Sequence, residues 1–277
     1  MQARALAAKR AGQRIAFVPT MGYLHAGHVS LLQQGRALGE LLVLSIFVNP
    51  MQFGPREDLS RYPRDLMGDL RKAISAGCDV AFIPTPQTMY PEGFQTRVQV
   101  TEVEHGLCGA ARPGHFVGVS TVVLKLIHIV QPDVLLLGEK DYQQLQVIRR
   151  MALDLNLPVR VLGCPLVRDA DGLALSSRNV YLSADERKEA LALSRALFTA
   201  QRLWQAGERR PQLLATAAAD VLAQAPGVRL SYLELRDADT LAELPGDVAL
   251  GPAQSVVLLI AAHVGTTRLI DNVVLRP

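Results

Sequence analysis

Stretches of consecutive apolar residues alternate with amphipathic segments along the first two thirds of the chain. Such apolar stretches are typical of strands that helices cover on both faces. Between them, apolar residues recur at intervals of three and four positions, which predicts helices. Regular alternation of the two predicts an α/β fold with a doubly wound, mostly parallel sheet. The predicted strands span 15–20, 41–49, 79–84, 133–138 and 159–167, and the predicted helices include 28–39, 65–77 and 142–155.

The pattern changes after about residue 175. Two long helical patterns come first, and three strand patterns with polar turns follow them. That order predicts a second, smaller α+β domain with antiparallel pairing. We therefore expect one domain at 1–175 and another at 176–277. In the second domain the predicted helices span 183–205 and 211–224, and the predicted strands span 229–237, 255–264 and 266–271.

Composition narrows the class of protein. The chain has 277 residues, of which 49% are hydrophobic and 20% charged, as is ordinary for a globular enzyme and unlike a disordered chain. The net charge is +3 and the basic residues are scattered, so we expect no nucleic-acid partner. The three cysteines form no Cys-x-x-Cys pair, which favours a reducing cytoplasm. No apolar run is long enough to cross a bilayer and the first residues resemble no signal peptide, so we expect neither membrane insertion nor secretion.

Candidate chemistry begins in PTMGYLHAGH, residues 19–28, where the first predicted strand ends and the first helix begins. Open α/β sheets bind ligands at this edge, and a helix N-terminus attracts anions. His25 and His28 are therefore placed to hold phosphates, and Gly27 allows the backbone to approach a nucleotide. A structural alternative remains, in which one histidine caps the helix while the other packs inside. Zinc binding is less favoured, because no third ligand is evident nearby.

Two further stretches carry similar chemistry. LGEKDYQQ, residues 137–144, places Lys140 and Asp141 directly after a strand, and LALSSRN, residues 173–179, places two serines and an arginine beyond the fifth apolar run. Each alone could be a solvated turn. At the carboxyl ends of parallel strands they together describe a polyphosphate site with an acid available for a ribose.

Six motifs give the chain a resemblance to a known family. In order, they are PTMGYLHAGH, SIFVNPMQF, RPGHFVGVSTVV, QPDVLLLGEKDYQQL, DGLALSSRN and RLIDN. They resemble the pantothenate synthetase (pantoate–β-alanine ligase) family across nearly the whole chain, whereas His-x-Gly-His alone indicates only a wider superfamily of nucleotidyl transferases. The resemblance implies a Rossmann-like N-terminal domain, a small C-terminal lid domain and a homodimer. It also implies an ATP- and magnesium-dependent ligase that joins pantoate to β-alanine through a pantoyl-adenylate, releasing pyrophosphate and AMP.

The resemblance also implies roles for individual residues. His28, His25 and Lys140 are the catalytic candidates, with His28 treated by the family as the catalytic acid. Gln52 and Gln144 resemble the pair that holds pantoate, whereas Asn49, Arg112 and His115 match motif positions without a firm role. The candidate ATP-binding residues are Met21, Gly22, Tyr23, Leu24, His25, Ala26, Gly27, His28, Gly138, Glu139, Lys140, Asp141, Val167, Leu175, Ser176, Ser177 and Arg178.

Three other segments bear on the expected mechanism. FGPREDLSRYPRD, residues 53–65, is too polar for a core and follows Gln52, so we expect either a mobile lid that shields the adenylate or a plain surface loop. Family members often carry an acidic pair where this chain has Met67, Gly68 and Asp69, so we assign no protein ligand to magnesium. Members also usually carry more residues before the first helix.

Two other functions compete with the ligase. A nucleotidyltransferase of the same superfamily would stop at the adenylated product, and a regulatory protein would bind nucleotide at an idle site. The dense set of phosphate-binding side chains disfavours the idle site. A tRNA synthetase is disfavoured because the chain is short and lacks a basic anticodon-reading domain.

Overall fold

The computed structural model describes residues 1–55, 57–246 and 248–277, which divide into two compact units. The first unit comprises 1–139 and 147–166, and the second comprises 140–146 and 167–277. Residues 140–146 and 167–175 thus belong to the second unit, whereas the sequence pattern assigned them to the first domain. The predicted boundary at 175 stays a prediction.

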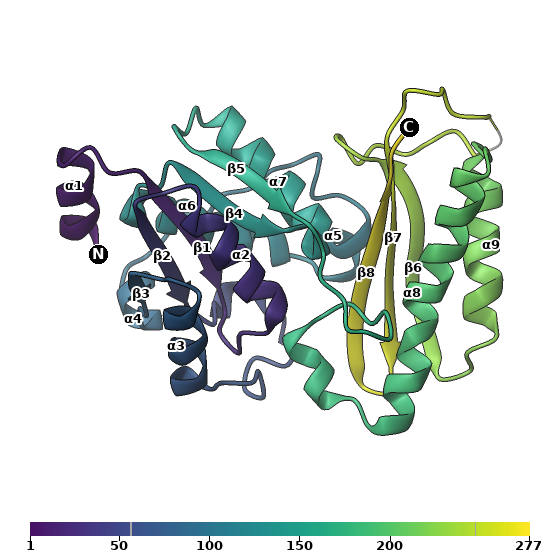
Figure 1. Ribbon diagram of the computed structural model, residues 1–277, viewed down its shortest axis with the longest axis horizontal. Helices are drawn as coiled ribbons and strands as arrows, with labels where there is room; N and C mark the ends of the chain where they lie inside the picture. Colours follow the sequence, from purple (N-terminus) through teal and green to yellow (C-terminus); the bar gives the residue numbers. More distant parts are fainter. Residues whose placement is uncertain (56, 247) are drawn as a thin grey trace. The chain divides into compact units, whose positions relative to one another are not determined.

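The first unit contains a five-stranded sheet in the order β3-β2-β1-β4-β5, and every neighbouring pair is parallel (Figure 1). The predicted doubly wound α/β fold is therefore confirmed. Its elements are α1 (Gln2–Arg10), β1 (Ile15–Thr20), α2 (Ala26–Arg36), β2 (Leu41–Ile46), η1 (Pro50–Gln52), α3 (Leu66–Ser75), β3 (Val80–Phe82), α4 (Pro86–Met89), α5 (Leu107–Ala111), α6 (His115–Val130), β4 (Val134–Gly138) and β5 (Arg160–Cys164). Between the strands β4 and β5 run η2 (Glu139–Asp141) and α7 (Tyr142–Asp154).

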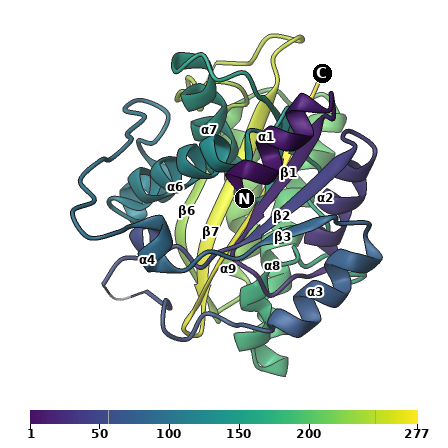
Figure 2. The ribbon, with the colours of Figure 1, turned by 90° about the vertical axis from the view of Figure 1, so that its left-hand side faces the viewer.

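Alternation along β1 explains how helices cover both faces of this sheet. Ala16 and Val18 pack in a core with Leu31 and Leu32 of α2, whereas Phe17, which is fully buried, points to the opposite face. Figure 2 shows α2 and α6 on opposite sides of the sheet. β1 and β4 pair only at Ala16–Val134 and at Phe17–Leu135. The last residues of both strands, at their carboxyl ends, are therefore not paired with each other. In this strand order, that edge between β1 and β4 is where open α/β sheets bind ligands.

Three predicted strands are too long. The strand predicted at 79–84 is only β3, Val80–Phe82. In the other two, particular residues after the strand explain where it ends. β2 ends at Ile46 because Asn49 caps the 3₁₀ helix that follows and Pro50 has no N–H for a ladder. β5 ends at Cys164, and the chain next forms a bridge between Arg168 and Ala174 instead of continuing the strand.

The second unit contains an antiparallel sheet in the order β6-β7-β8, which confirms the predicted α+β arrangement of this part of the chain. One face of the sheet packs with α8 and α9 in a core that includes Leu197, Leu214, Leu258 and Ile260, and Figure 1 shows the two helices side by side. Among the described residues, no helix is both long and apolar enough to cross a membrane. The unit's elements are η3 (Ser177–Tyr181), α8 (Ala184–Gln205), α9 (Pro211–Ala223), β6 (Val228–Asp237), β7 (Val256–Val264) and β8 (Thr267–Leu275).

Candidate active site

The loop after β1 has a backbone that its residue types only partly favour. Gly22 lies at φ +86° and Tyr23 at φ 51°, both in the left-handed region. A Cβ on Gly22 would lie 3.0 Å from Asp69 Oδ2 and 3.0 Å from Ile46 Cγ2. Glycine is therefore required at 22 both by conformation and by space, and the strain at Tyr23 marks a loop that the surrounding structure must hold.

Asp69 of α3 holds that loop. Its side chain is 1% exposed, and its two oxygens accept the backbone N–H of Tyr23 at 2.8 Å and of Leu24 at 2.6 Å. Lys72, one turn further along α3, donates to the Leu24 carbonyl at 2.7 Å. Bonds of a charged group to backbone are stronger than neutral ones, so this carboxylate and ammonium fix the loop that leads to the histidines.

His25 and His28 form a pair of rings at the start of α2. His25 is the N-cap, and its Nδ1 accepts the Gly27 N–H at 3.2 Å. His28 Nδ1 accepts the His25 N–H at 3.3 Å, and the two ring centroids are 4.1 Å apart. Because each Nδ1 is an acceptor, a neutral ring carries its proton on Nε2. Both rings are half-buried.

The capping bonds decide one of the alternatives that the sequence left open. His25 does cap the helix, as the structural alternative proposed, but neither histidine is buried in the interior. The same capping bonds make Nε2–H the donor on each ring. Two such donors at a helix N-terminus suit an anion.

Gln52 is the last residue of η1, the 3₁₀ helix that follows β2 in the first unit. Its carbonyl lies 2.9 Å from His115 Nδ1 and accepts from Arg112 at 3.3 Å. Arg112 also makes a two-pronged ion pair with Glu57, at 2.8 and 2.6 Å. Burial alone would raise the pKa of Glu57, but the hydrogen bonds and the charge of Arg112 outweigh it and lower that pKa below its ordinary value. The ion pair joins part of the predicted lid to the end of α5, where Arg112 is the C-cap. Arg56, also in the predicted lid, lies outside the described residues.

Most of the other candidate residues lie in the second unit, and the rest lie in the first. Lys140 Nζ lies 3.8 Å from Asp141 Oδ2, and Gln144 follows in the first turn of α7. Ser176 Oγ accepts the Arg178 N–H at 3.3 Å and caps η3, which also contains Ser177. Of the remaining candidates, Ala26, Gly27 and His28 form the first turn of α2, Gly138 ends β4, Glu139 begins η2, and Val167 and Leu175 are joined by a backbone hydrogen bond of 3.0 Å.

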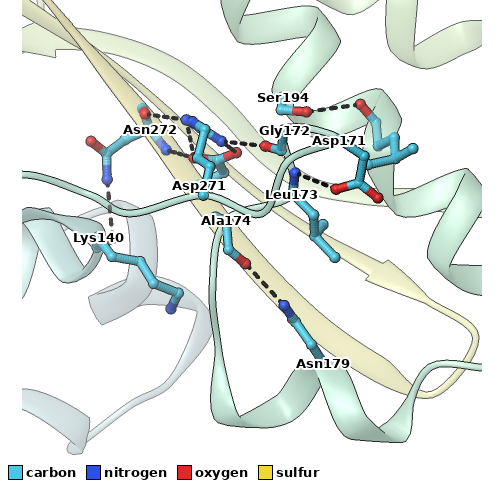
Figure 3. A network of polar contacts seen from close by, with 11 residues as sticks. Lys140, Asp171, Gly172, Leu173, Ala174, Asn179, Ser194, Asp271 and Asn272 are labelled. Carbon is cyan, nitrogen blue, oxygen red and sulfur yellow. Dashed lines mark hydrogen bonds and ion pairs between the residues drawn. The ribbon is translucent and has the colours of Figure 1, made fainter. Parts of the chain in front are cut away.

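Strand β8 holds Lys140 and the hairpin around Gly172, which precedes Ser176, within this unit (Figure 3). Asp271 accepts two bonds from Arg168, at 2.6 and 2.8 Å, and Arg168 also donates to the Gly172 carbonyl at 3.0 Å. The next residue, Asn272, donates to the Lys140 carbonyl at 3.0 Å. Burial raises the pKa of Asp271, while Arg168 and the Asn272 N–H oppose that rise. Two adjacent residues of one strand therefore hold two candidate phosphate-binding segments that are far apart in sequence.

Comparisons with known proteins show the family of the chain. A family model described as pantoate-beta-alanine ligase matches residues 1–274. The chain belongs to the pantoate–β-alanine ligase family. It is 54% identical to the pantothenate synthetase of Syntrophotalea carbinolica, over 98% of this chain and 94% of that one, and 56% identical to that of Myxococcus xanthus, over 95% and 89%.

Solved structures extend the likeness to the fold. The crystal structure of pantothenate synthetase from Thermus thermophilus has a TM-score of 0.89 at 47% identity and covers 95% of this chain and 94% of its own. A pantoate-beta-alanine ligase from Francisella tularensis, solved with beta-gamma ATP and beta-alanine, has a TM-score of 0.76 at 34% identity, over 95% and 90%. The predicted family, fold class and enzyme class are therefore confirmed.

Sequence reasoning missed several residues that hold the candidate site of this ligase family member. Asp69 was considered only for metal, although it lies on the buried stripe of α3 with Gly68 and Ala73, where an acid needs a partner. RLIDN entered the resemblance without a role, and Asp271 in it supports the hairpin ahead of Ser176. Among the described residues, no group of three or more His, Cys, Asp or Glu side chains is arranged to hold a metal ion.

Proposed function

We propose that this chain condenses pantoate with β-alanine at the expense of ATP. Membership of the pantoate–β-alanine ligase family supports the reaction. The observation that carries the proposal is the pair of imidazoles at the N-terminus of α2, because their capping bonds use Nδ1 as the acceptor and so put the proton of each neutral ring on Nε2, at a helix end that attracts anions. The Francisella tularensis relative, solved with beta-gamma ATP and beta-alanine, supports the choice of ligands.

The reaction proceeds in two steps. A pantoate carboxylate oxygen attacks the α-phosphorus of ATP, and the bond to the β-phosphate oxygen breaks, which releases pyrophosphate and forms pantoyl-adenylate. The uncharged amine of β-alanine then attacks the acyl carbon, loses a proton and expels AMP. No covalent enzyme intermediate is needed, so catalysis rests on positioning and electrostatics.

In this proposal each candidate residue has a defined part. His28 and His25 stabilise the charge that grows on the α-phosphate and the departing pyrophosphate, and Lys140 neutralises the phosphate chain. Gln52 and Gln144 hold pantoate with neutral donors and acceptors. ATP is further bound by the loop residues Met21, Gly22, Tyr23 and Leu24, by Ala26 and Gly27, by Gly138, Glu139 and Asp141, by Val167 and Leu175, and by Ser176, Ser177 and Arg178.

Magnesium enters as part of the substrate MgATP, with phosphate oxygens and water filling most of its coordination shell.

We further propose that the protein is a cytoplasmic homodimer, and that residues 53–65 form a lid that shields the adenylate from water. Exposed apolar side chains on one side of α3, Met67 at 65% and Ile74 at 72%, support a partner surface there. Sedimentation of wild type and of Ile74→Asp tests the dimer, and the ratio of ATP consumed to amide formed, measured after shortening the segment, tests the lid.

Isotope exchange tests the order of the chemistry. Labelled pyrophosphate should exchange into ATP when pantoate and magnesium are present and β-alanine is absent, because the first step is reversible without the amine. Adding β-alanine should convert exchange into net release of AMP. Exchange that ignores pantoate, or that needs a different acid, overturns the proposal, and no exchange at all indicates an idle nucleotide site.

Substitution of the imidazoles tests the observation that carries the proposal. His28→Ala should lower turnover by about two to three orders of magnitude, as expected for one lost donor to a developing negative charge, while ATP binding weakens less. His25→Ala should behave similarly. The control is His128→Ala, which removes an exposed histidine of α6. Near-normal turnover of His28→Ala would return the pair to a structural role.

A further inference from the structure

Asn49 is a buried amide whose hydrogen-bonding positions are all used. Its side chain is 1% exposed and caps η1. Asn49 Oδ1 accepts from the Tyr90 hydroxyl at 2.7 Å and from the Met51 N–H at 3.3 Å. Asn49 Nδ2 donates to the Gly118 carbonyl at 3.1 Å and to Gln52 Oε1 at 3.0 Å. Two bonds to the oxygen and two from the nitrogen satisfy the amide completely.

The partners of Asn49 determine which way its amide faces. A backbone N–H only donates, so the atom facing Met51 is the oxygen, and a backbone carbonyl only accepts, so the atom facing Gly118 is the nitrogen. Gln52 must then present its oxygen to Asn49 and turn its NH₂ group away. That nitrogen lies 3.5 Å from the sulfur of Met21, in the loop after β1.

Tyr90 makes the shorter of the two bonds to the Asn49 oxygen. Burial raises the pKa of Tyr90 above its ordinary value, so the hydroxyl keeps its proton and remains a donor. Its ring packs between other groups, with the Phe94 centroid at 5.1 Å and the Phe47 centroid at 6.2 Å. The donor is thus held in place from outside the candidate site.

Close backbone packing limits how far this arrangement can relax. A Cβ on Gly118 would lie 2.3 Å from the Met51 carbonyl oxygen, so α6 rests directly against η1. A rigid contact of this kind preserves the direction of each hydrogen bond, because neither backbone segment can move to offer a different partner.

We propose that Tyr90 is a positioning residue that holds Asn49 in place, so that Asn49 keeps Gln52 turned with its amide N–H₂ toward the acidic substrate. The hydrogen-bond directions run from the Tyr90 hydroxyl to the Asn49 oxygen, from the Asn49 nitrogen to the Gln52 oxygen, and leave the Gln52 nitrogen as donor. Such a donor suits the carboxylate or hydroxyl oxygen of a hydroxy acid and disfavours a cationic group. The inference rests on the proposed role of Gln52 in holding pantoate.

Tyr90→Phe tests the proposal, since it removes only the hydroxyl and keeps the ring contacts. The KM for pantoate should rise about 3- to 10-fold, the range for one neutral hydrogen bond, while kcat and the KM for ATP stay within about twofold. The matched control is Thr121→Val in α6, which removes a buried hydroxyl that bonds the Val117 carbonyl and the Val98 N–H. The control should lower stability without raising the KM for pantoate.

A double-mutant cycle separates positioning from general support of the fold. In a Gln52→Ala background, adding Tyr90→Phe should change the KM for pantoate by less than about twofold, because the group it acts through is gone. An undiminished effect in that background, or an unchanged KM in the single variant, overturns the role of Tyr90. Failure of wild type to show pantoate-dependent pyrophosphate exchange would instead overturn the proposed function, so the two failures are distinguishable.

Discussion

Asp69→Asn is the sharpest test of how the fold builds the candidate site. The substitution keeps the size and shape of a side chain that is 1% exposed, so no cavity forms. Of the two oxygens that accept the Tyr23 and Leu24 N–H groups, one becomes an NH₂ group facing another donor. One charge-assisted bond is lost and one buried N–H is left unsatisfied, so we expect a loss of about 2–4 kcal/mol in the free energy of unfolding.

Function should fall with stability, because the loop held by Asp69 leads directly to His25. We expect pantoate-dependent pyrophosphate exchange to drop about 10- to 100-fold, since small misplacements of a reacting group are costly. Urea unfolding followed by far-UV circular dichroism gives the free energy, and native-state hydrogen exchange reports the Tyr23 and Leu24 amides directly. The only tryptophan, Trp204, lies in the second unit and is a poor reporter for this loop.

Asp65→Asn is the matched control in the same helix. Asp65 caps α3 by accepting the Gly68 N–H at 2.9 Å, and asparagine caps about as well, so we expect a change within about 0.5 kcal/mol. If Asp69→Asn unfolds at the same urea concentration as this control, and its two loop amides exchange no faster, the carboxylate does not hold the loop.

Three more predictions concern other parts of the chain. Arg168→Met should lower the free energy of unfolding by about 3 kcal/mol, because it leaves the carboxylate of Asp271, which is 4% exposed, without its cation. The control Arg187→Met should cost less than about 1 kcal/mol, because the carboxylates that Arg187 pairs with are more exposed. Thermal unfolding compares the two variants. The lowered pKa of Glu57 means that its ion pair stabilises the fold above the ordinary carboxyl pKa and is lost as pH falls through the folded value. The gap in melting temperature between wild type and Glu57→Gln should therefore be full at pH 7 and shrink below about pH 4.5; a gap independent of pH would contradict this. Burial, aided by the charge of Glu139, raises the pKa of the Cys164 thiol to about 11. A thiol reagent at pH 8 should therefore label Cys164 slowly in the native protein and rapidly in guanidinium. Fast labelling of Cys164 in the native protein would refute the burial argument.

The sequence alone predicted the fold class, the position of each strand in the two sheets and several of the helices, but not the helix α6 and not where every strand ends. Apolar runs such as 15–20 and 133–138 became β1 and β4, because a strand covered on both faces must be apolar throughout. The helical pattern at 183–205 became α8, and the structure adds that Ser183 and Glu186 form a capping box at its start. Local rules of this kind depend on neighbours within a few residues.

The histidine pair shows where local pattern stops being sufficient. Spacing placed His25 and His28 at a helix start, but the direction in which each ring presents its proton depends on bonds from Gly27 and from the His25 backbone. The sequence alone is compatible both with a histidine that caps the helix and with a histidine that binds a phosphate. The structure assigns the capping to Nδ1, which leaves Nε2–H as the donor on each ring.

Only tertiary structure could decide which remote residues hold the candidate site. Asp69 lies 45 positions from Leu24 in the chain, and Asp271 lies 103 positions from Arg168. No periodic signal links residues so far apart, because their partnership arises from how helices and strands pack and not from the path of the chain. A buried charge without a partner destabilises the fold. A single sequence shows which residues are charged or polar, but it does not show which of them come into contact. Local sequence therefore determined the elements and the identity of the chemistry, and three-dimensional packing determined its orientation and support.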